Sequence, residues 1–242
     1  MVYLRKATSR GAVDFGWLRS KHSFSFGHYY DPKHMGFSVL RVINDDIVAA
    51  GRGFETHGHR DMEIISYVVN GALKHKDSTG NEYIVPEGDI QVMSAGKGIM
   101  HSEFNPSQHA PVNFLQIWIV PSEKGGEPQY SQRSFGKSAQ EDAPSTKSEL
   151  LVSSDGKLDS LRIKQDASIS RIQLGDGEQI EQITQARKGY LHVVSGQAEV
   201  AIKSEDNAIS VGQGDGVGVY EHDAMTIRAK DAFVALWFDL PS

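Results

Sequence analysis

The fold is decided by a stretch in the first half of the chain, Gly51-Arg-Gly-Phe-Glu-Thr-His57-Gly-His59-Arg-Asp-Met-Glu63. Its downstream counterpart is Gly98-Ile-Met-His101-Ser-Glu103-Phe-Asn105. Each stretch carries two metal-ligand types two positions apart, and in a β-strand such residues point to the same face, about 6.6 Å from each other. Two strands lying about 4.8 Å apart would place all four donors around one point. The pattern therefore predicts one divalent metal ion held by His57, His59, His101 and Glu103.

Composition limits the chemistry outside these stretches. The 242 residues include 10 histidines and no cysteine, which leaves imidazole and carboxylate as the strong metal ligands. The longest apolar runs, 114–120 and 233–238, are far shorter than the roughly 20 residues that a membrane span needs. No apolar stretch follows the first basic residues, so we expect a cytoplasmic protein without a secretory signal. A net charge of −6 with dispersed cations disfavours nucleic-acid binding.

Turn residues divide the chain into many short segments. The 24 glycines separate β-branched and aromatic runs, which is typical of an all-β barrel or sandwich. Helical periodicity is best at 15–21 and 149–151, and both segments are short. A composition rich in Gly, Pro, Ser and Gln marks a connection, so we predict a barrel at 1–125, a connecting segment at 126–148 and a second barrel at 149–242.

Two segments on either side of this connection resemble each other. Tyr67-Val-Val-Asn-Gly71 precedes Pro86-Glu-Gly-Asp89, and Leu191-His-Val-Val-Ser-Gly196 precedes Gly212-Gln-Gly-Asp215 at nearly the same spacing. A duplicated barrel explains both. The alternative is two unrelated halves, since every β-hairpin uses similar turn residues.

The spacing of the first two stretches matches a known family. Gly51-x5-His57-x-His59 and Gly98-x2-His101-x3-Asn105 are the two motifs that define cupins, so the chain resembles a cupin. It further resembles the pirin family over 1–120, through Phe24-Ser-Phe-Gly27, Leu40-Arg-Val-Ile-Asn-Asp45, His59-Arg-Asp-Met-Glu63, His75-Lys-Asp-Ser78 and Met93-Ser-Ala-Gly-Lys-Gly-Ile-Met-His-Ser-Glu103.

The resemblance implies a bicupin, with two jelly-roll barrels in one chain. Pirins bind one metal ion in the N-terminal barrel through three His and one Glu, the same set that strand geometry predicts. Generic cupins take their carboxylate from the position of Glu63, which shares the strand parity of His57 and His59. We favour Glu103, with Glu63 orienting a ligand imidazole. The chain departs from the usual patterns at Gly58 and Gly96, where proline is common.

The second barrel offers no comparable ligands. Ile180-Glu-Gln-Ile183 occupies the region of the His pair, and Asp223 to Thr226 the region of the His-Glu pair, so we predict a metal-free barrel. His192 and His222 are interpreted as packing or surface residues, and His22 and His28 as structural rather than substrate-contacting. The remaining candidates are aromatic residues favoured as core over cavity lining: Phe24, Phe26, Phe37 and Trp118.

Three imidazoles and a carboxylate leave open positions on a six-coordinate ion, which substrate and dioxygen can occupy. Such donors suit Fe(II), Mn, Co, Ni, Cu or Zn, and the resemblance favours iron. It also implies a quercetin 2,3-dioxygenase activity, in which a flavonol is cleaved by dioxygen with release of carbon monoxide. Glu103 would then be the catalytic base as well as a ligand.

Two alternatives stay open at this stage. Pirins also resemble metal- or redox-sensing regulatory proteins, which bind a protein partner without turnover. The other alternative is an oxygenase for another aromatic or enol substrate. A substrate-sized cavity at the ion would favour an enzyme, and a closed site beside an exposed patch would favour a regulatory protein.

Overall fold

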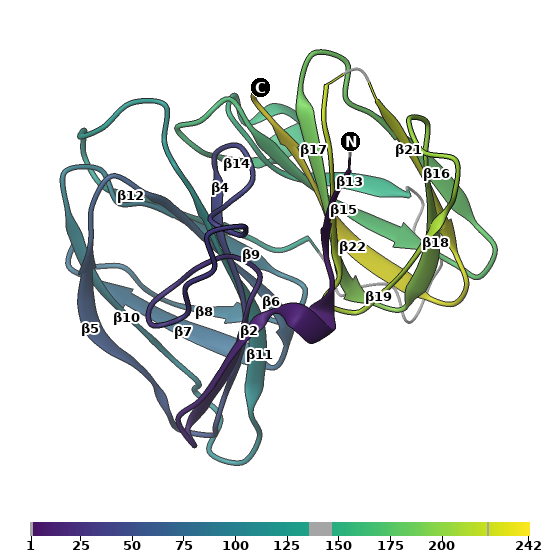
Figure 1. Cartoon of the computed structure of the whole chain (residues 1–242). Coiled ribbons are helices and arrows are strands. Elements are labelled where there is room, and N and C mark those ends of the chain that lie inside the picture. The colour runs from purple at the N-terminus through teal and green to yellow at the C-terminus, as the bar shows by residue number, and fades with distance from the viewer. Residues whose placement is uncertain (1, 136–146, 222) are drawn as a thin grey trace. The chain divides into compact units, whose positions relative to one another are not determined.

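The computed structural model describes residues 2–135, 147–221 and 223–242, which form two compact units (Figure 1). Among these residues, the N-terminal unit comprises 11–135 and 154–165, and the C-terminal unit comprises 2–10, 147–153 and 166–242. The predicted division at 126–148 stays a prediction, because residues 136–146 of that segment lie outside the described residues. His222 also lies outside the described residues, so its interpretation as a packing or surface residue stays a prediction.

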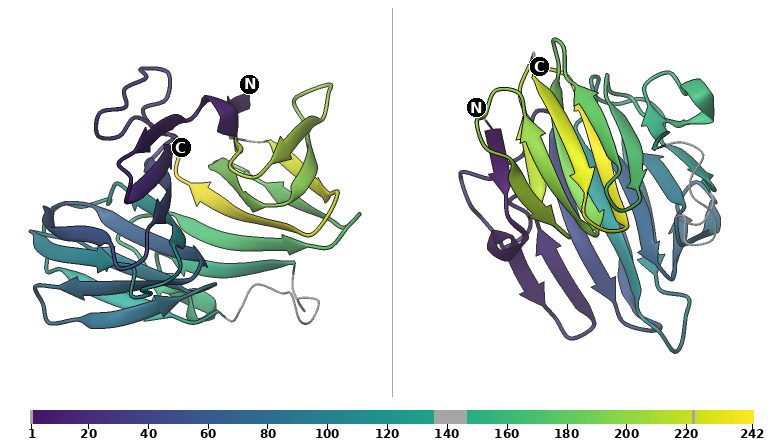
Figure 2. Two further views of the ribbon diagram at one scale, coloured as in Figure 1. Left: turned by 90° about the horizontal axis from the view of Figure 1, so that it is seen from below. Right: turned by 90° about the vertical axis from the view of Figure 1, so that its right-hand side faces the viewer.

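The N-terminal unit consists of two facing β-sheets. One sheet has the strand order β12-β9-β6-β11-β4-β3-β2, and the other has the order β5-β10-β7-β8. Figure 2 shows the first hairpin, in purple, continuing the larger sheet. The elements are β2 (Gly11–Asp14), β3 (Leu18–His22), β4 (Leu40–Val48), β5 (Gly53–His59), β6 (Glu63–Asn70), β7 (Ala72–Asp77), β8 (Glu82–Pro86), β9 (Ile90–Ser94), β10 (Ile99–Phe104), β11 (Val112–Ile119), β12 (Gln129–Arg133), the 3-10 helix η2 (Lys157–Asp159) and β14 (Leu161–Arg162).

The C-terminal unit repeats this arrangement. Its sheets have the orders β1-β20-β17-β22-β15-β13 and β16-β21-β18-β19. The first strand of the chain thus pairs with a strand more than 200 residues later, as the purple strand beside the yellow-green one shows (Figure 2). The elements are β1 (Val2–Arg5), the 3-10 helix η1 (Ala7–Ser9), β13 (Ser148–Ser153), β15 (Ser168–Leu174), β16 (Gln179–Ile183), β17 (Lys188–Ser195), β18 (Gln197–Ile202), β19 (Ile209–Gly212), β20 (Gly216–Val219), β21 (Ala224–Ala229) and β22 (Phe233–Leu240).

The two units share one topology. The orders β9-β6-β11-β4 and β5-β10-β7-β8 in one unit correspond to β20-β17-β22-β15 and β16-β21-β18-β19 in the other. The repeated glycines hold equivalent turns: Gly71 and Gly196, which follow β6 and β17, both have positive φ, at 85° and 79°. A side chain at Gly196 would collide with the carbonyl oxygen of Ala232. The predicted all-β bicupin fold is confirmed.

The helical periodicity of segments 15–21 and 149–151 is a wrong guide, because neither segment is helical. Residues 18–22 form β3, in which Leu18, Ser20 and His22 are buried and the residues between them are exposed. Residues 149–151 lie within β13. Pairing with a neighbouring strand, β4 in the first case and β15 in the second, outweighs a local pattern of two turns or fewer. None of the helices in the described residues has the length and apolar character that crossing a membrane requires.

The interiors of the two units differ in polarity. The C-terminal unit holds an extended apolar cluster that includes Leu191, Val217, Ile227 and Trp237. In the N-terminal unit, one apolar cluster contains Val68 and Phe114, and a separate one contains Ile64 and Met93. Ser66 lies on β6 between these clusters and is fully buried. Buried polar side chains therefore interrupt the core of the N-terminal unit.

Candidate metal centre

Three imidazoles meet between β5 and β10. The two strands pair antiparallel with His57 opposite His101, and His59 lies two residues further along β5. The Nε2 atoms of His57 and His101 are 3.1 Å apart. One nitrogen from each of the three rings lies within 4.8 Å of the others. The structure thus brings the three sequence-predicted histidines to one point.

The spacing and protonation of these rings fit a divalent cation. Adjacent nitrogen ligands with bonds of about 2.1 Å are about 3 Å apart, close to the separation seen here. Nδ1 of His57 donates to the carbonyl oxygen of Glu55 at 2.7 Å, which leaves the lone pair of Nε2 for a metal. Burial, reinforced by neighbouring imidazoles, lowers the pKa of His101 to about 3 and that of His59 to about 4. Both rings are therefore neutral near pH 7.

Glu103 is buried and anchored by three donors. Its Oε1 accepts hydrogen bonds from Ser66 Oγ at 2.9 Å and from Gln91 Nε2 at 2.8 Å. Its Oε2 accepts one from Gln116 Nε2 at 2.7 Å. A carboxylate has about four lone-pair positions, so one stays available for a metal ion or a proton. These three donors were not predicted from the sequence, although each is a polar residue within an apolar run.

A second group of close ligand atoms contains His75, His101 and Glu103, all buried and within 4.8 Å of one another. Glu103 is therefore beside His101 but falls outside the group that contains His57 and His59. His75 was not predicted from the sequence as part of the site. It lies opposite Glu103 on β7, and its Nε2 is 3.0 Å from Oδ2 of Asp77. The His-x-Asp spacing on a strand indicates only that His75 and Asp77 share a face, and the pairing of β7 with β10 brings that face to the site.

Glu63 lies in neither group of potential ligands among the described residues. Its carboxylate accepts hydrogen bonds from Ser94 Oγ at 2.6 Å and the backbone amide of Lys164 at 3.2 Å, rather than from a ligand imidazole. Burial raises its pKa. The strand parity with His57 and His59 fails because β5 ends at His59, and Asp61 then turns the chain with a φ of 52°.

A cavity of about 500 Å³ opens beside these groups. Its apolar walls are Trp17, Phe26, Phe54 and Trp118, and its polar lining is Asn44, Asp46, Glu55, His57, His59, Glu103 and Gln116. Of the four aromatic residues weighed from the sequence, Phe26 and Trp118 line the cavity, whereas Phe24 and Phe37 are buried core. His22 is buried with its ring against Phe26 at 5.4 Å, and His28 is exposed.

The equivalent positions of the C-terminal unit carry different side chains. Ile180 and Gln182 on β16 lie opposite Ile227 and Met225 on β21. Both β21 residues are fully buried in the apolar cluster of that unit. The expectation of a metal-free second barrel stays a prediction. His192 is buried within β17.

Two barrels of one topology, the first with clustered imidazoles at its interior, define a bicupin with a candidate metal centre. A family model described as Pirin matches residues 4–119, and one described as Quercetinase C-terminal cupin domain matches residues 150–240. The chain belongs to the pirin family, as the sequence resemblance predicted.

Full-length relatives support the same assignment. Quercetin 2,3-dioxygenase of Escherichia coli K12 is 45% identical, over 100% of this chain and 99% of the relative. A pirin-like protein of Caulobacter vibrioides is 40% identical, over 93% and 94%. The crystal structure of the bacterial pirin YhhW from Escherichia coli in complex with nickel(II) superposes with a TM-score of 0.89 at 44% identity, over 100% of this chain and 99% of that one. The predicted quercetin 2,3-dioxygenase type of enzyme agrees with these names.

Proposed function

We propose that this chain is a metal-dependent dioxygenase that cleaves flavonols such as quercetin with dioxygen and releases carbon monoxide. The observation that carries the proposal is the aromatic-walled cavity beside His57, His59 and Glu103. Its volume of about 500 Å³ falls within the range of pockets that bind small molecules. The names of the full-length relatives point to the same substrate class.

The proposed metal ligands are His57, His59, His101 and Glu103, holding one divalent ion per chain. Neutral imidazoles with a carboxylate suit Fe(II), which we favour, and also Mn, Co, Ni, Cu or Zn. The nickel complex of the Escherichia coli relative makes nickel a specific alternative to test. A bound ion would stabilise the negative charge on the deprotonated flavonol and bring dioxygen to it.

The chain's own residues would bind, orient and deprotonate the substrate. Trp118 and Phe54 offer flat apolar surfaces for a planar ring system and exclude water from it. Glu103 would accept the proton of the flavonol 3-hydroxyl at the lone-pair position of Oε2 that its three donors leave, and would give up its bond to the ion as it does so. Gln116 and Gln91 each donate a hydrogen bond to a different oxygen of the carboxylate, so the base is oriented before the substrate arrives.

The same cavity bears on the alternatives. A regulatory protein without turnover does not need a cavity for a small molecule at its metal ion, so the cavity favours the enzyme. An oxygenase for another aromatic or enol substrate would use the same walls and the same base. The substrate itself therefore has to be tested directly.

The test is a pair of conservative variants at two buried carboxyl groups. We expect metal-loaded wild type to bleach quercetin under air and release carbon monoxide. Glu103→Gln should retain quercetin binding but lower kcat by roughly 10²- to 10⁴-fold, the usual contribution of a general base. Glu63→Gln, which alters a carboxyl group outside the cavity, should keep activity within a few fold. Absorbance of the flavonol and carbon monoxide in the gas phase are the readouts.

Two results would contradict the proposal. If metal-loaded wild type consumes no dioxygen with any flavonol, the substrate class is wrong. If Glu103→Gln turns over at the wild-type rate, Glu103 is not the base.

A further inference from the structure

A row of polar side chains crosses the inner face of the larger sheet of the N-terminal unit. The register places His22 opposite Asn44, Asn44 opposite Gln116, and Gln116 opposite Ser66. Ser66 in turn lies opposite Gln91. Directly paired residues share a face of a sheet, so these five side chains line up across β3, β4, β11, β6 and β9. Such a row in a barrel interior requires hydrogen-bond partners.

Only part of the row is used by Glu103. Ser66, Gln91 and Gln116 bond its carboxylate, as described above. Asn44 does not bond this carboxylate and lines the cavity. Asp46, two positions further along β4, lines it as well. Both are 3% exposed. The Oδ1 atom of Asn44 has no hydrogen-bond partner within the part of the chain that the structure describes, and the Asp46 carboxyl has Ser20 of β3 beside it.

Both groups have the chemistry to bind a hydroxyl. An amide donates through its nitrogen and accepts through its oxygen. Burial raises the pKa of Asp46 to about 7, so a large share of its carboxyl is protonated near neutral pH and can also donate and accept. The surrounding walls are aromatic, with Trp17 and Phe54 among them. A hydroxyl-bearing ligand would offer these cavity-lining groups a hydrogen-bond partner, which an apolar ligand would not.

We propose that Asn44 and Asp46 form a second polar subsite of the cavity. It hydrogen-bonds a phenolic hydroxyl of the substrate other than the one that Glu103 deprotonates. The subsite selects polyhydroxylated flavonols over flavonols without further hydroxyl groups. This inference rests on the proposed function, because it presupposes a flavonol in the cavity.

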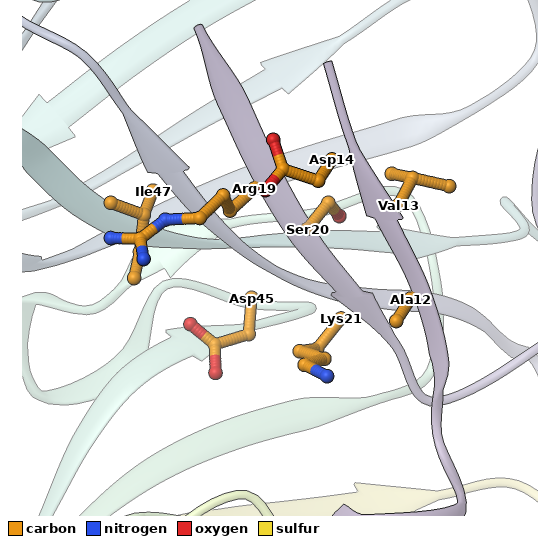
Figure 3. A pocket seen from close by; sticks show the side chains of 8 residues that line it. All are labelled: Ala12, Val13, Asp14, Arg19, Ser20, Lys21, Asp45 and Ile47. Atoms are coloured by element: carbon orange, nitrogen blue, oxygen red, sulfur yellow. The ribbon is translucent and has the colours of Figure 1, made fainter. Parts of the chain in front are cut away.

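The chain provides a matched control on the same strand. Asp45 precedes Asp46, and alternation along β4 turns its side chain to the other face of the sheet. There it accepts a hydrogen bond from Asn113 Nδ2 at 2.8 Å. Figure 3 shows Asp45 with Arg19 and Lys21 in a separate pocket of that face. A change at Asp45 thus alters the same residue type without touching the cavity.

The experiment measures anaerobic binding to metal-loaded protein, without turnover. The two ligands are quercetin and 3-hydroxyflavone, which has only the 3-hydroxyl group. Wild type should bind quercetin more tightly. Asn44→Leu and Asp46→Leu should each weaken quercetin binding by roughly 5- to 10-fold, as loss of one hydrogen bond predicts, and leave 3-hydroxyflavone binding within about twofold. Asp45→Leu should change neither affinity.

The outcomes separate this inference from the proposed function. If wild type binds both ligands equally, or if both cavity variants keep the preference for quercetin, the subsite is refuted while flavonol binding stands. If wild type binds neither ligand, the proposed function fails and the subsite with it. Should Asp46→Leu not fold, as judged by circular dichroism, the same decision rests on Asn44→Leu.

Discussion

Asp46 is a carboxyl group at an interior position, and its titration should be visible in protein stability. Burial raises its pKa from 3.8 to about 7, so the folded state holds a proton that the unfolded chain releases. Its contribution to stability is full below pH 3.8 and is lost as pH rises through 7. Asp46→Asn removes this loss. We expect the Tm difference between Asp46→Asn and wild type, both metal-free, to grow in favour of the variant between pH 5 and pH 8.

Thermal melting of wild type and Asp46→Asn in matched buffers checks this prediction. A constant difference for Asp46→Asn would mean that Asp46 is ionised in the fold throughout the range.

At the same scale, the candidate site divides into residues that sequence predicts and residues that it does not. His57 with His59, and His101 with Glu103, are close in sequence, so strand geometry alone places each pair on one face. His75 enters the site only because β7 pairs with β10. That register is set by long-range pairing, and no local pattern encodes it.

At the scale of single elements, the strands follow from alternation and turn residues, and the errors follow from short windows. β18 alternates exposed and buried residues throughout, which is the pattern that the sequence analysis used. β3 has the same alternation, but its five residues are too few to distinguish a strand from a helix. Its pairing with β4 decides the conformation.

Two glycines of β5 should respond in opposite ways to alanine. Neither Gly53 nor Gly58 has a positive φ, so the backbone itself tolerates alanine at both positions. A Cβ at Gly58 would meet Met100 Sδ at 3.0 Å, and that side chain is 46% exposed and can move. Gly58→Ala should therefore stabilise the fold by about 0.4–1 kcal/mol, through lower entropy of the unfolded chain. A Cβ at Gly53 would lie 2.6 Å from Cα of Phe104 on β10, so Gly53→Ala should destabilise by about 1–3 kcal/mol.

Denaturant unfolding of the two variants beside wild type measures these differences. The contrast between two identical substitutions on one strand separates the effect of the unfolded chain from that of the strand pairing. Equal effects at both positions would mean that β5 is not held against β10 at this register.

At the scale of the whole molecule, duplication was predictable from the spaced glycine landmarks, whereas the composition of each unit was not. β1 belongs to the C-terminal unit because it pairs with β20, and residues 154–165 belong to the N-terminal unit. Neither assignment has a local signal, since a strand two hundred residues from its partner looks like any other. The clustered ligand atoms of the described residues are divided unequally between the units, because they occur on β5, β7 and β10.

This division predicts a local response to metal. A ligand stabilises the state that binds it, so it slows the local openings that expose backbone amides to exchange. Adding nickel(II) to metal-free protein should slow hydrogen exchange in β5, β10 and β7, which carry His57, His101 and His75. The corresponding strands β16, β21 and β18 should exchange at an unchanged rate, because apolar residues fill that interior. His101→Gln should lose the metal-dependent protection, and His109→Gln, at an exposed position, should keep it. Equal slowing in both units, or protection that survives His101→Gln, would place the ion somewhere other than between β5 and β10.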